Sequence, residues 1–481
     1  MNTDDDQPAD RRLHPFGWRP DRERTESLCP VCLERIPARR TAVGDNIHLV
    51  KTCSRHGTFE TPIWRGSPIF ERWRRDKIPI AAPAPLKATD SDCPYDCGPC
   101  PVHRQRPCTV IIEVTQRCNL SCPVCYADAP SDLPDPSAAL VAQLFHRAAE
   151  TAPGSNIQLS GGEPTVRNDL PELVAMGREV GFDFIQVNTN GLRFAKDPGF
   201  VKALKQAGLA SVFLQFDGID DHVYRRLRGR ALMADKRAAI AACAQEGIGV
   251  VLVPTLVPGV NTRCIGEILE AALSWTPAVR GVHFQPVSYF GRFGEKSGGM
   301  DRFTLPEVIR AIESQSNGMV KAEDLGPPGC ENALCSFHGR FLYSTDGEMV
   351  PLKASAPVPC CSTPATAEAG AARAMAAVAR QWKGPQQPIA EEGCGDGRSC
   401  RPPVGAPAQG DAVAPMSLDV FIDRARTHTF SISAMAFQDA WTITLDRVQE
   451  CCIIVMAPDG RQVPFCLYNL TAEDGRRLYR P

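Results

Sequence analysis

The 481-residue chain carries 53 Lys and Arg against 55 Asp and Glu, a formal net charge of −2, which argues against a nucleic-acid-binding protein. Its acidic, polar N-terminus does not resemble a secretory signal, and no run of about 18 apolar residues predicts a membrane span. The chain has 21 cysteines, and their close spacing favours metal ligation in a reducing cytoplasm over disulfides.

The N-terminal part predicts a small metal-binding module. Residues 1–27 are polar and charged, and we expect them to be disordered. In the module, residues 28–80, Cys29 and Cys32 form one knuckle, and Cys53 and His56 form a second. This spacing predicts a tetrahedral site for one zinc or iron ion, rubredoxin-like or zinc-ribbon-like. Taken alone, this region would also fit a zinc-binding module that serves only in protein interactions.

A second cysteine group lies in residues 85–108. Cys93, Cys97 and Cys100 follow a C-x3-C-x2-C spacing. With Cys108, or less favourably His103, as fourth ligand, they predict a closed auxiliary [4Fe-4S] cluster.

The same spacing recurs at the end of an apolar strand, 109–115. Cys118, Cys122 and Cys125 place three thiolates on the loop that leaves this strand. A [4Fe-4S] cluster normally takes four cysteines, so three leave one iron open to another ligand. An open metal position is typical of a catalytic site.

Alternating strands and helices over residues 109–320 predict an α/β fold, a partial (β/α)6 barrel of the TIM type. The expected strands are 109–115, 156–160, 183–189, 211–217, 249–256 and 281–288. The expected helices are 137–152, 168–180, 198–207, 221–246, 264–275 and 305–316.

One face of these strands is unusually polar for a buried parallel sheet. It carries Glu113, Thr115, Gln158, Ser160, Gln186, Asn188, Asn190, Gln215, Asp217, Thr255, His283 and Gln285. Barrel enzymes place their chemistry at the carboxyl ends of the strands. We therefore expect a polar lumen there, with Glu113 and His283 as candidate catalytic residues.

Two hairpins are expected after the barrel, in residues 325–353 and 416–481, each built on an Asp-Gly turn. Cys330, Cys335, Cys452 and Cys466 would join them around one cluster, with Cys451 as the alternative to Cys452. Residues 354–415 are rich in Ala, Pro and Gly and predict an insertion with one helix, 365–382. Its cysteines, Cys360, Cys361, Cys394 and Cys400, are expected to be bystanders.

The cysteine loop, the turn Gly161-Gly162-Glu163-Pro164, and the segments around Asn188, Asn190, Gln215 and Asp217 together resemble the radical S-adenosylmethionine (SAM) superfamily. The resemblance implies that the open iron binds the methionine end of SAM. It assigns Gly161, Gly162 and Glu163 to that end, and Asn188, Asn190, Gln215 and Asp217 to cofactor binding. Val124 stands where the superfamily often has an aromatic residue, and Tyr126 is expected to compensate.

At finer grain the chain resembles a subfamily of archaeal tetraether lipid synthases and dihydropterin methyltransferase-like proteins, which share the N-terminal metal site and a segment like Pro464–Asn469. This implies one catalytic and two auxiliary [4Fe-4S] clusters, one mononuclear metal, and an electron donor such as flavodoxin or ferredoxin. The expected reaction is hydrogen abstraction followed by carbon–carbon bond formation on a lipid-like substrate. The alternatives are methylation of a pterin-like ring and a non-catalytic electron carrier.

Overall fold

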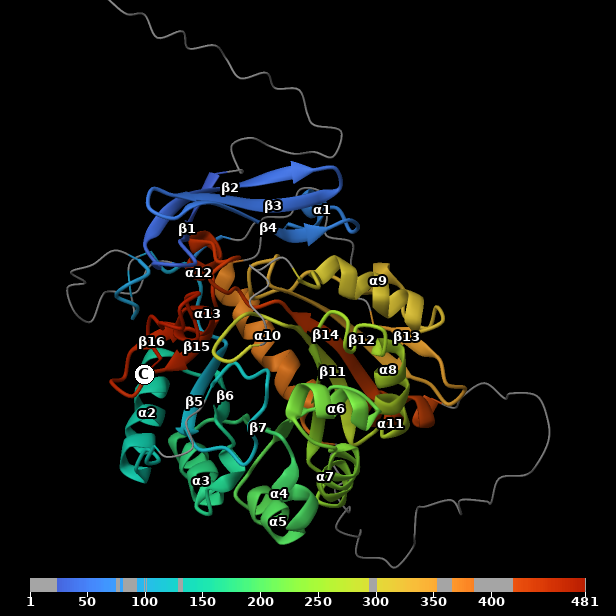
Figure 1. Cartoon of the computed structure of the whole chain (residues 1–481). Helices are drawn as coiled ribbons and strands as arrows, with labels where there is room; N and C mark the ends of the chain where they lie inside the picture. The colour runs from blue at the N-terminus through green and yellow to red at the C-terminus, as the bar shows by residue number, and fades with distance from the viewer. Residues whose placement is uncertain are drawn as a thin grey trace, which may run out of the picture.

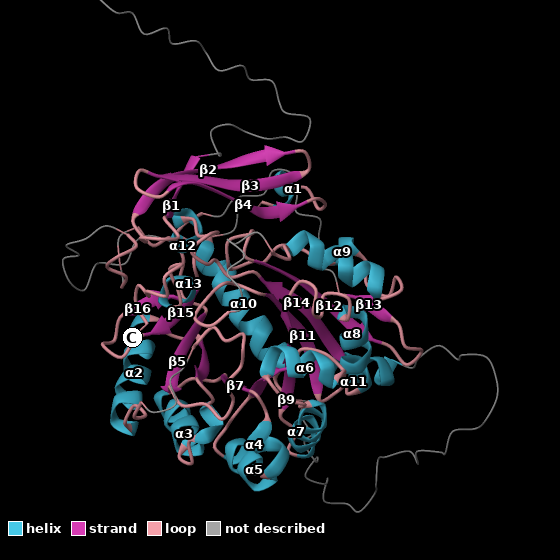
Figure 2. Ribbon diagram, viewed as in Figure 1, coloured by secondary structure: helices cyan, strands magenta, loops and turns pink. Residues whose placement is uncertain are grey.

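The computed structural model describes residues 24–74, 78–80, 93–98, 100, 102–128, 133–293, 301–352, 366–384 and 418–480. Most of the expected N-terminal tail and insertion lies outside these ranges, including Cys360, Cys361, Cys394 and Cys400. Within them, two sheets account for the fold: a small antiparallel sheet above and a large mixed sheet below (Figures 1 and 2).

The small sheet is an antiparallel meander of β1 (Arg24–Leu28), β2 (Arg35–Val43), β3 (Asn46–Cys53) and β4 (Gly57–Arg65), followed by α1 (Phe70–Trp73). Alternate residues of β2 and β3 are buried, as expected for a sheet with one solvated face. Two buried cations fix it to the C-terminal part of the chain. Arg40 donates to Asp446 at 2.6 Å, and Lys51 donates to the Ala440 carbonyl at 2.6 Å.

The six predicted barrel strands are confirmed and lie side by side in parallel. They are β5 (Thr109–Thr115), β6 (Asn156–Gly161), β7 (Ile185–Thr189), β8 (Ser211–Gln215), β9 (Gly249–Val253) with its continuation β10 (Thr255–Leu256), and β11 (Val279–Pro286).

Helices that each bury apolar residues cover the outside of this sheet (Figure 2). They are α2 (Ala138–Thr151), α3 (Leu170–Val180), α4 (Leu192–Lys196), α5 (Pro198–Gln206), α6 (Asp221–Arg228), α7 (Met233–Gln245), α8 (Ile265–Ser274) and α9 (Leu305–Gln315). The single helix expected over 221–246 is two helices. Gly229 ends α6 in the left-handed conformation, and the Asp221 carboxylate accepts from the first backbone amides of the next helix.

The C-terminal strands extend the barrel sheet at both edges instead of forming a separate layer. The two predicted hairpins are present as β12 (Ser336–Tyr343) with β13 (Met349–Pro351), and β15 (Ile453–Met456) with β16 (Gln462–Pro464). In addition, β14 (Thr429–Met435) pairs in parallel with β11, and β15 pairs in parallel with β5. The remaining helices are α10 (Ala367–Trp382), α11 (Leu418–Thr427), α12 (Leu445–Gln449) and α13 (Phe465–Tyr468).

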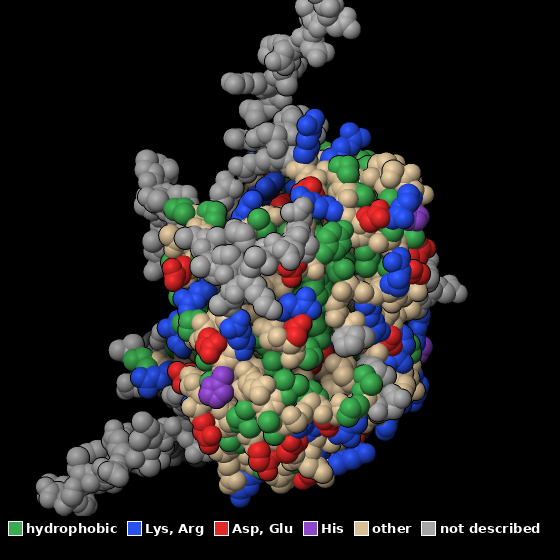
Figure 3. All heavy atoms as spheres, turned by 90° about the vertical axis from the view of Figure 1, so that its left-hand side faces the viewer, with side chains coloured by type: hydrophobic (Ala, Val, Ile, Leu, Met, Phe, Trp, Pro, Cys, Tyr) green, Lys and Arg blue, Asp and Glu red, His purple; other side chains and the backbone are tan. Residues whose placement is uncertain are grey.

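No helix in the described part of the chain is both long enough and apolar enough to cross a membrane. On the face in Figure 3, basic and acidic side chains are interspersed. This mixture agrees with the nearly balanced charge of the sequence.

Candidate active site and metal centres

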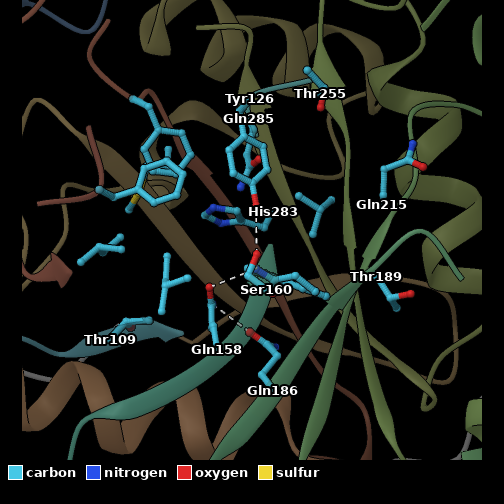
Figure 4. Close-up of a pocket in the computed structure, with 18 of the residues that line it drawn as sticks. Thr109, Tyr126, Gln158, Ser160, Gln186, Thr189, Gln215, Thr255, His283 and Gln285 are labelled. Carbon is cyan, nitrogen blue, oxygen red and sulfur yellow. Dashed lines mark hydrogen bonds between the residues drawn. The ribbon is translucent and has the colours of Figure 1, made fainter. Parts of the chain in front are cut away.

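A cavity of about 320 Å³ lies inside the barrel, within the size range of small-molecule sites. Its upper end, at the carboxyl ends of the strands, is lined by the cluster-loop residues Cys118, Cys122 and Cys125. Its middle carries polar side chains from several strands, among them Gln158, Ser160, Gln186 and His283 (Figure 4). Asn188 also lines the cavity. Its lower end is lined by Phe184, Phe213, Ala374, Met375, Val378 and Trp382, whereas Met435 lines it at the carboxyl end of β14.

The cluster loop is held from three sides. Cys125 and Arg292 exchange backbone hydrogen bonds of 2.8 and 2.9 Å. Arg228 donates to the Val124 carbonyl at 3.0 Å, and Asn190 donates to the Asn119 side chain at 2.7 Å. Burial raises the pKa of the Cys118 thiol to about 12, so a thiolate at this position depends on a bound cation. The three thiols therefore share one cavity on a fixed loop, as a cluster requires.

Gly161 and Gly162 allow the turn after β6 to lie directly on the start of the cluster loop. A Cβ on Gly161 would come within 2.0 Å of the Thr115 carbonyl oxygen, and one on Gly162 within 2.2 Å of the Arg117 oxygen. The turn donates to these same oxygens, from Gly162 N at 2.9 Å and Glu163 N at 2.8 Å. Only glycine permits this approach of the two backbones.

The Glu163 carboxylate lines the cavity and is held mainly through one of its oxygens. Oε1 accepts from the Thr165 amide and hydroxyl and from the Thr189 hydroxyl at 2.7 Å, whereas Oε2 accepts only from Asn190 N at 2.6 Å. Each carboxylate oxygen can accept two hydrogen bonds. Oε2 therefore keeps one acceptor position for an incoming donor.

Asn188 lines the cavity and has one unpaired acceptor atom. Its amide nitrogen approaches Gln158 and Ser160 at 3.4 Å, but its buried Oδ1 has no hydrogen-bond partner. Such an orphaned atom calls for a ligand or water. Tyr126, which directly follows the third cysteine, lines the same cavity and its hydroxyl lies 2.9 Å from Ser160 Oγ (Figure 4).

Gln215 and Asp217 were both expected to bind the cofactor, but only Gln215 lines the cavity. Gln215 lines the cavity and accepts from Lys236 Nζ at 2.7 Å. Asp217 is completely buried outside the cavity lining, where Arg228 donates to both of its oxygens at 2.7 and 2.8 Å. Asp217 thus orients Arg228. Neither Arg228 nor Lys236 was found from the sequence, because charge on an amphipathic helix normally indicates a solvated face.

The two candidate catalytic residues of the lumen are also differently placed. Glu113 does not line the cavity, because its carboxylate is ion-paired with Arg480 and accepts from Gln116 at 2.8 Å. His283 does line it, stacked on Phe213 with Nδ1 2.8 Å from Ser433 Oγ. Burial lowers the pKa of His283 to about 4. The imidazole is therefore neutral near pH 7, which suits a wall or hydrogen-bonding residue better than a proton donor.

The N-terminal sheet gathers the predicted mononuclear metal site. Cys29, Cys32, Cys53 and His56 place their ligand atoms within 4.8 Å of one another. His56 Nδ1 lies 3.6 Å from Cys29 Sγ and 3.4 Å from Cys53 Sγ, and the Cys32 and Cys53 sulfurs are 4.0 Å apart. These separations fit a tetrahedral ion with metal–sulfur bonds of about 2.3 Å.

The auxiliary cysteines are grouped differently from the prediction. Cys108, Cys330 and Cys452 place their sulfurs within 4.8 Å, so Cys108 does not join Cys93, Cys97 and Cys100. The cause is the pairing of β15 with β5, in which the Cys452 carbonyl accepts from Cys108 N at 2.9 Å. The alternative ligand, His103, is 2.9 Å from the Cys451 carbonyl through Nε2.

Cys335 and Cys466 were expected in one group with Cys330 and Cys452, but they lie apart from these two cysteines. They lie near Cys451, and burial together with these neighbouring thiols raises the pKa of Cys451 well above its usual value. Arg447 donates to Cys335 Sγ from two nitrogens at 3.3 Å. Cys451 and Cys452 thus lie with different groups of cysteines. Cys93, Cys97 and Cys100 line a separate cavity.

Comparison with known proteins agrees with this arrangement. Residues 112–272 match the Radical SAM superfamily, and residues 22–65 match the HMPTM N-terminal zinc ribbon domain. A 7,8-dihydro-6-hydroxymethylpterin dimethyltransferase of Methanocaldococcus jannaschii is 33% identical, covering 93% of each chain. Fe-coproporphyrin III synthase of Methanosarcina barkeri is 38% identical over 49% of this chain and 57% of its own length.

Among solved structures, Streptococcus suis SuiB bound to S-adenosylmethionine is similar over 45% of this chain and 48% of its own, with 16% identity and a TM-score of 0.36. The chain thus spans about half of that structure.

Proposed function

The chain belongs to the radical SAM superfamily and is an enzyme, and from this we propose that it forms a carbon–carbon bond at an unactivated carbon of a substrate that carries an apolar chain. The observation that carries the proposal is the single cavity that extends from the cluster cysteines to the apolar lower end of the barrel. A strand of seven residues such as β5 spans roughly 20 Å, which suits an elongated group.

The residues that face the upper end fit a cluster and SAM. A [4Fe-4S] cluster and SAM, when bound, supply a 5′-deoxyadenosyl radical through one-electron cleavage of the sulfonium C5′–S bond. In the proposed site, Cys118, Cys122 and Cys125 hold the cluster. Gly162 and the remaining acceptor position of Glu163 receive the amino end of the methionine, with Gly161 forming the tight turn beside them, and the unpaired Oδ1 of Asn188 accepts from a hydroxyl.

The chain also provides the shielding that a radical needs. Val124, Val253, Phe290 and Phe465 are among the apolar side chains that line the cavity near the loop and the strand ends. Such walls exclude water and hold the target carbon close to the reactive atom. The reducing electron must come from a low-potential donor, for which a flavodoxin or ferredoxin is the proposed partner.

The buried cysteine groups support a role for auxiliary clusters. Cys108 belongs to the Cys108–Cys330–Cys452 group and also lines the lower part of the cavity. A cluster held there would lie next to the substrate and could accept or return an electron after bond formation. Cys93, Cys97 and Cys100, and Cys335, Cys451 and Cys466, are proposed as further ligand groups.

A second candidate function is methylation of a pterin-like ring. It is favoured by the amide row in the middle of the cavity, where Gln158 donates to Gln186 at 3.0 Å and Gln186 donates to Ser211 at 3.0 Å. Amide side chains can match the donors and acceptors at the edge of a flat heterocycle. The pterin dimethyltransferase name of the Methanocaldococcus jannaschii relative supports the same candidate.

Isotope transfer distinguishes these reactions. Reconstituted, reduced enzyme is incubated with SAM and either a lipid with a perdeuterated chain or a dihydropterin deuterated at the ring carbons that could be methylated. The proposal predicts deuterium in 5′-deoxyadenosine and a new carbon–carbon bond in the lipid product. Transfer from the pterin alone would favour the second candidate, and a product that is only desaturated or oxidised would contradict bond formation.

A further inference from the structure

Helix α10 closes the lower end of the barrel, although it comes from the segment that the sequence predicted as an insertion. In Figure 1 it lies between β5–β7 and β11–β14. Trp382 Nε1 donates to Ser431 Oγ at 3.1 Å, at the beginning of β14. Gln381, which is buried, donates to the Thr429 carbonyl at 2.9 Å and to the Arg280 carbonyl at 3.2 Å. These partners all lie at the starts of strands, opposite the cluster loop.

Two glycines show how closely the helix is seated. A Cβ on Gly249, the first residue of β9, would come within 2.2 Å of the Trp382 carbonyl oxygen. A Cβ on Gly370, near the other end of α10, would come within 2.3 Å of the Gly329 carbonyl oxygen. The helix is therefore in backbone contact with β9 at one end and with the segment before β12 at the other, and these contacts fix its position.

One face of α10 forms the floor of the cavity. Ala374, Met375, Val378 and Trp382 line it, at the three- and four-residue spacing of a helix face. The opposite face, with Ala372, Arg373, Ala376 and Arg380, is exposed. The helix thus presents small and flexible apolar side chains to the lumen and keeps its charges in solvent.

The walls next to this floor are largely apolar as well. Phe184, Phe213 and Ile453 line the cavity there, while the amides of Gln158 and Gln186 lie above. Thr109, Asn156 and Glu331 are the polar residues that also reach this end. An alkyl group that passes the amides would therefore end against α10.

We propose that α10 sets the length of the alkyl chain that the enzyme accepts, with Ala374, Met375 and Val378 as the specificity-determining residues. The inference rests on the proposed function, because it assumes a substrate with an apolar chain. These side chains would limit the chain length through their volume. Each additional carbon of the alkyl chain would need space that they already occupy, and a well-packed interior does not rearrange to provide it.

The test is a binding measurement that needs no turnover. Straight-chain fatty acids from octanoate to stearate compete with a fluorescent fatty acid for the reconstituted full-length protein. Ala374→Trp fills the floor, so the longest acid bound by the wild type should bind about tenfold more weakly, while the shortest members are unaffected. Ala376→Trp adds the same ring to the exposed face and is the matched control.

Met375→Ala makes the opposite change in side-chain volume. It keeps the proposal testable if Ala374→Trp does not fold. It enlarges the floor and should move the preference toward longer acids. An unchanged length preference in folded Ala374→Trp and Met375→Ala, with tight binding by the wild type, would overturn the role of α10 and leave the proposed function intact. A wild type that binds no fatty acid but binds a dihydropterin would overturn both.

Discussion

The two ends of the barrel build their metal sites in different ways. At the upper end, Cys118, Cys122 and Cys125 lie within one short loop, and two glycines and an asparagine hold that loop in place. At the lower end, Cys108, Cys330 and Cys452 come from three distant segments: the pairing of β15 with β5 brings Cys452 to Cys108, and Gln105 donates to the Cys330 carbonyl. A site built on one loop can be predicted from the local sequence, whereas a site built by sheet pairing depends on the whole fold.

The largest expected effect separates two adjacent cysteines at the lower end. Cys452→Ala should remove the cluster of the Cys108 group, about four irons, and leave the one near Cys335. Cys451→Ala should do the reverse. Iron analysis and electron paramagnetic resonance of the reconstituted variants would reveal two different missing signals. Cys243→Ala, a buried cysteine in α7, should keep every cluster. Loss of the same signal from both variants would show that Cys451 and Cys452 serve one site.

A smaller effect is expected from the contact that supports the upper end. Gly162→Ala forces a methyl group against the Arg117 carbonyl oxygen, which should destabilise the protein by about 2–4 kcal/mol and weaken SAM binding. Thermal unfolding and equilibrium binding of SAM measure the two consequences. Gly326→Ala meets no atom within 4 Å and is the control. Equal behaviour of the two variants would mean that the turn does not support the cluster loop.

The smallest effect concerns His283, in the wall between the two ends. Its pKa is about 4 in the folded protein and 6.5 ordinarily, so below pH 6.5 the unfolded chain takes up a proton that the folded chain does not. Wild-type stability should fall as the pH is lowered from 6.5 to 4, by up to about 3 kcal/mol.

His283→Phe should lack this loss, while at pH 7 it should cost about 1 kcal/mol through the lost contact with Ser433. Chemical denaturation across this pH range measures both effects. An equally steep fall in the variant would place the acid sensitivity in another group. Turnover should decrease in His283→Phe, because the ring lines the cavity, and an unchanged rate would mean that the ring serves stability alone.

The sequence predicted well those features that neighbouring residues determine. Strand 109–115 is β5 to the residue, and Cys29, Cys32, Cys53 and His56 meet as their spacing indicated. Gly161 and Gly162 stand where the backbone approaches most closely. In each case a short stretch contains both the turn and the residues that the turn positions, so local physics is sufficient.

Features that depend on distant contacts were not predicted. Periodicity placed Glu113 on the lumen face, but Arg480, near the end of the chain, draws its carboxylate into an ion pair. Asp217 is likewise engaged by Arg228 instead of facing a ligand. Helix α10 was predicted within the insertion, but its place on the floor of the cavity follows from the hydrogen bonds of Gln381 and Trp382 to strands β11 and β14. None of these partners is near in sequence.

The central claim is that the upper end cleaves SAM, and production of 5′-deoxyadenosine tests it most directly. Anaerobically reconstituted and reduced wild-type protein should release 5′-deoxyadenosine from SAM. Cys122→Ala, which loses one ligand of the cluster loop while the distant cysteine groups keep theirs, should release none and retain the auxiliary signals. Equal amounts of 5′-deoxyadenosine from the wild type and Cys122→Ala would contradict the account.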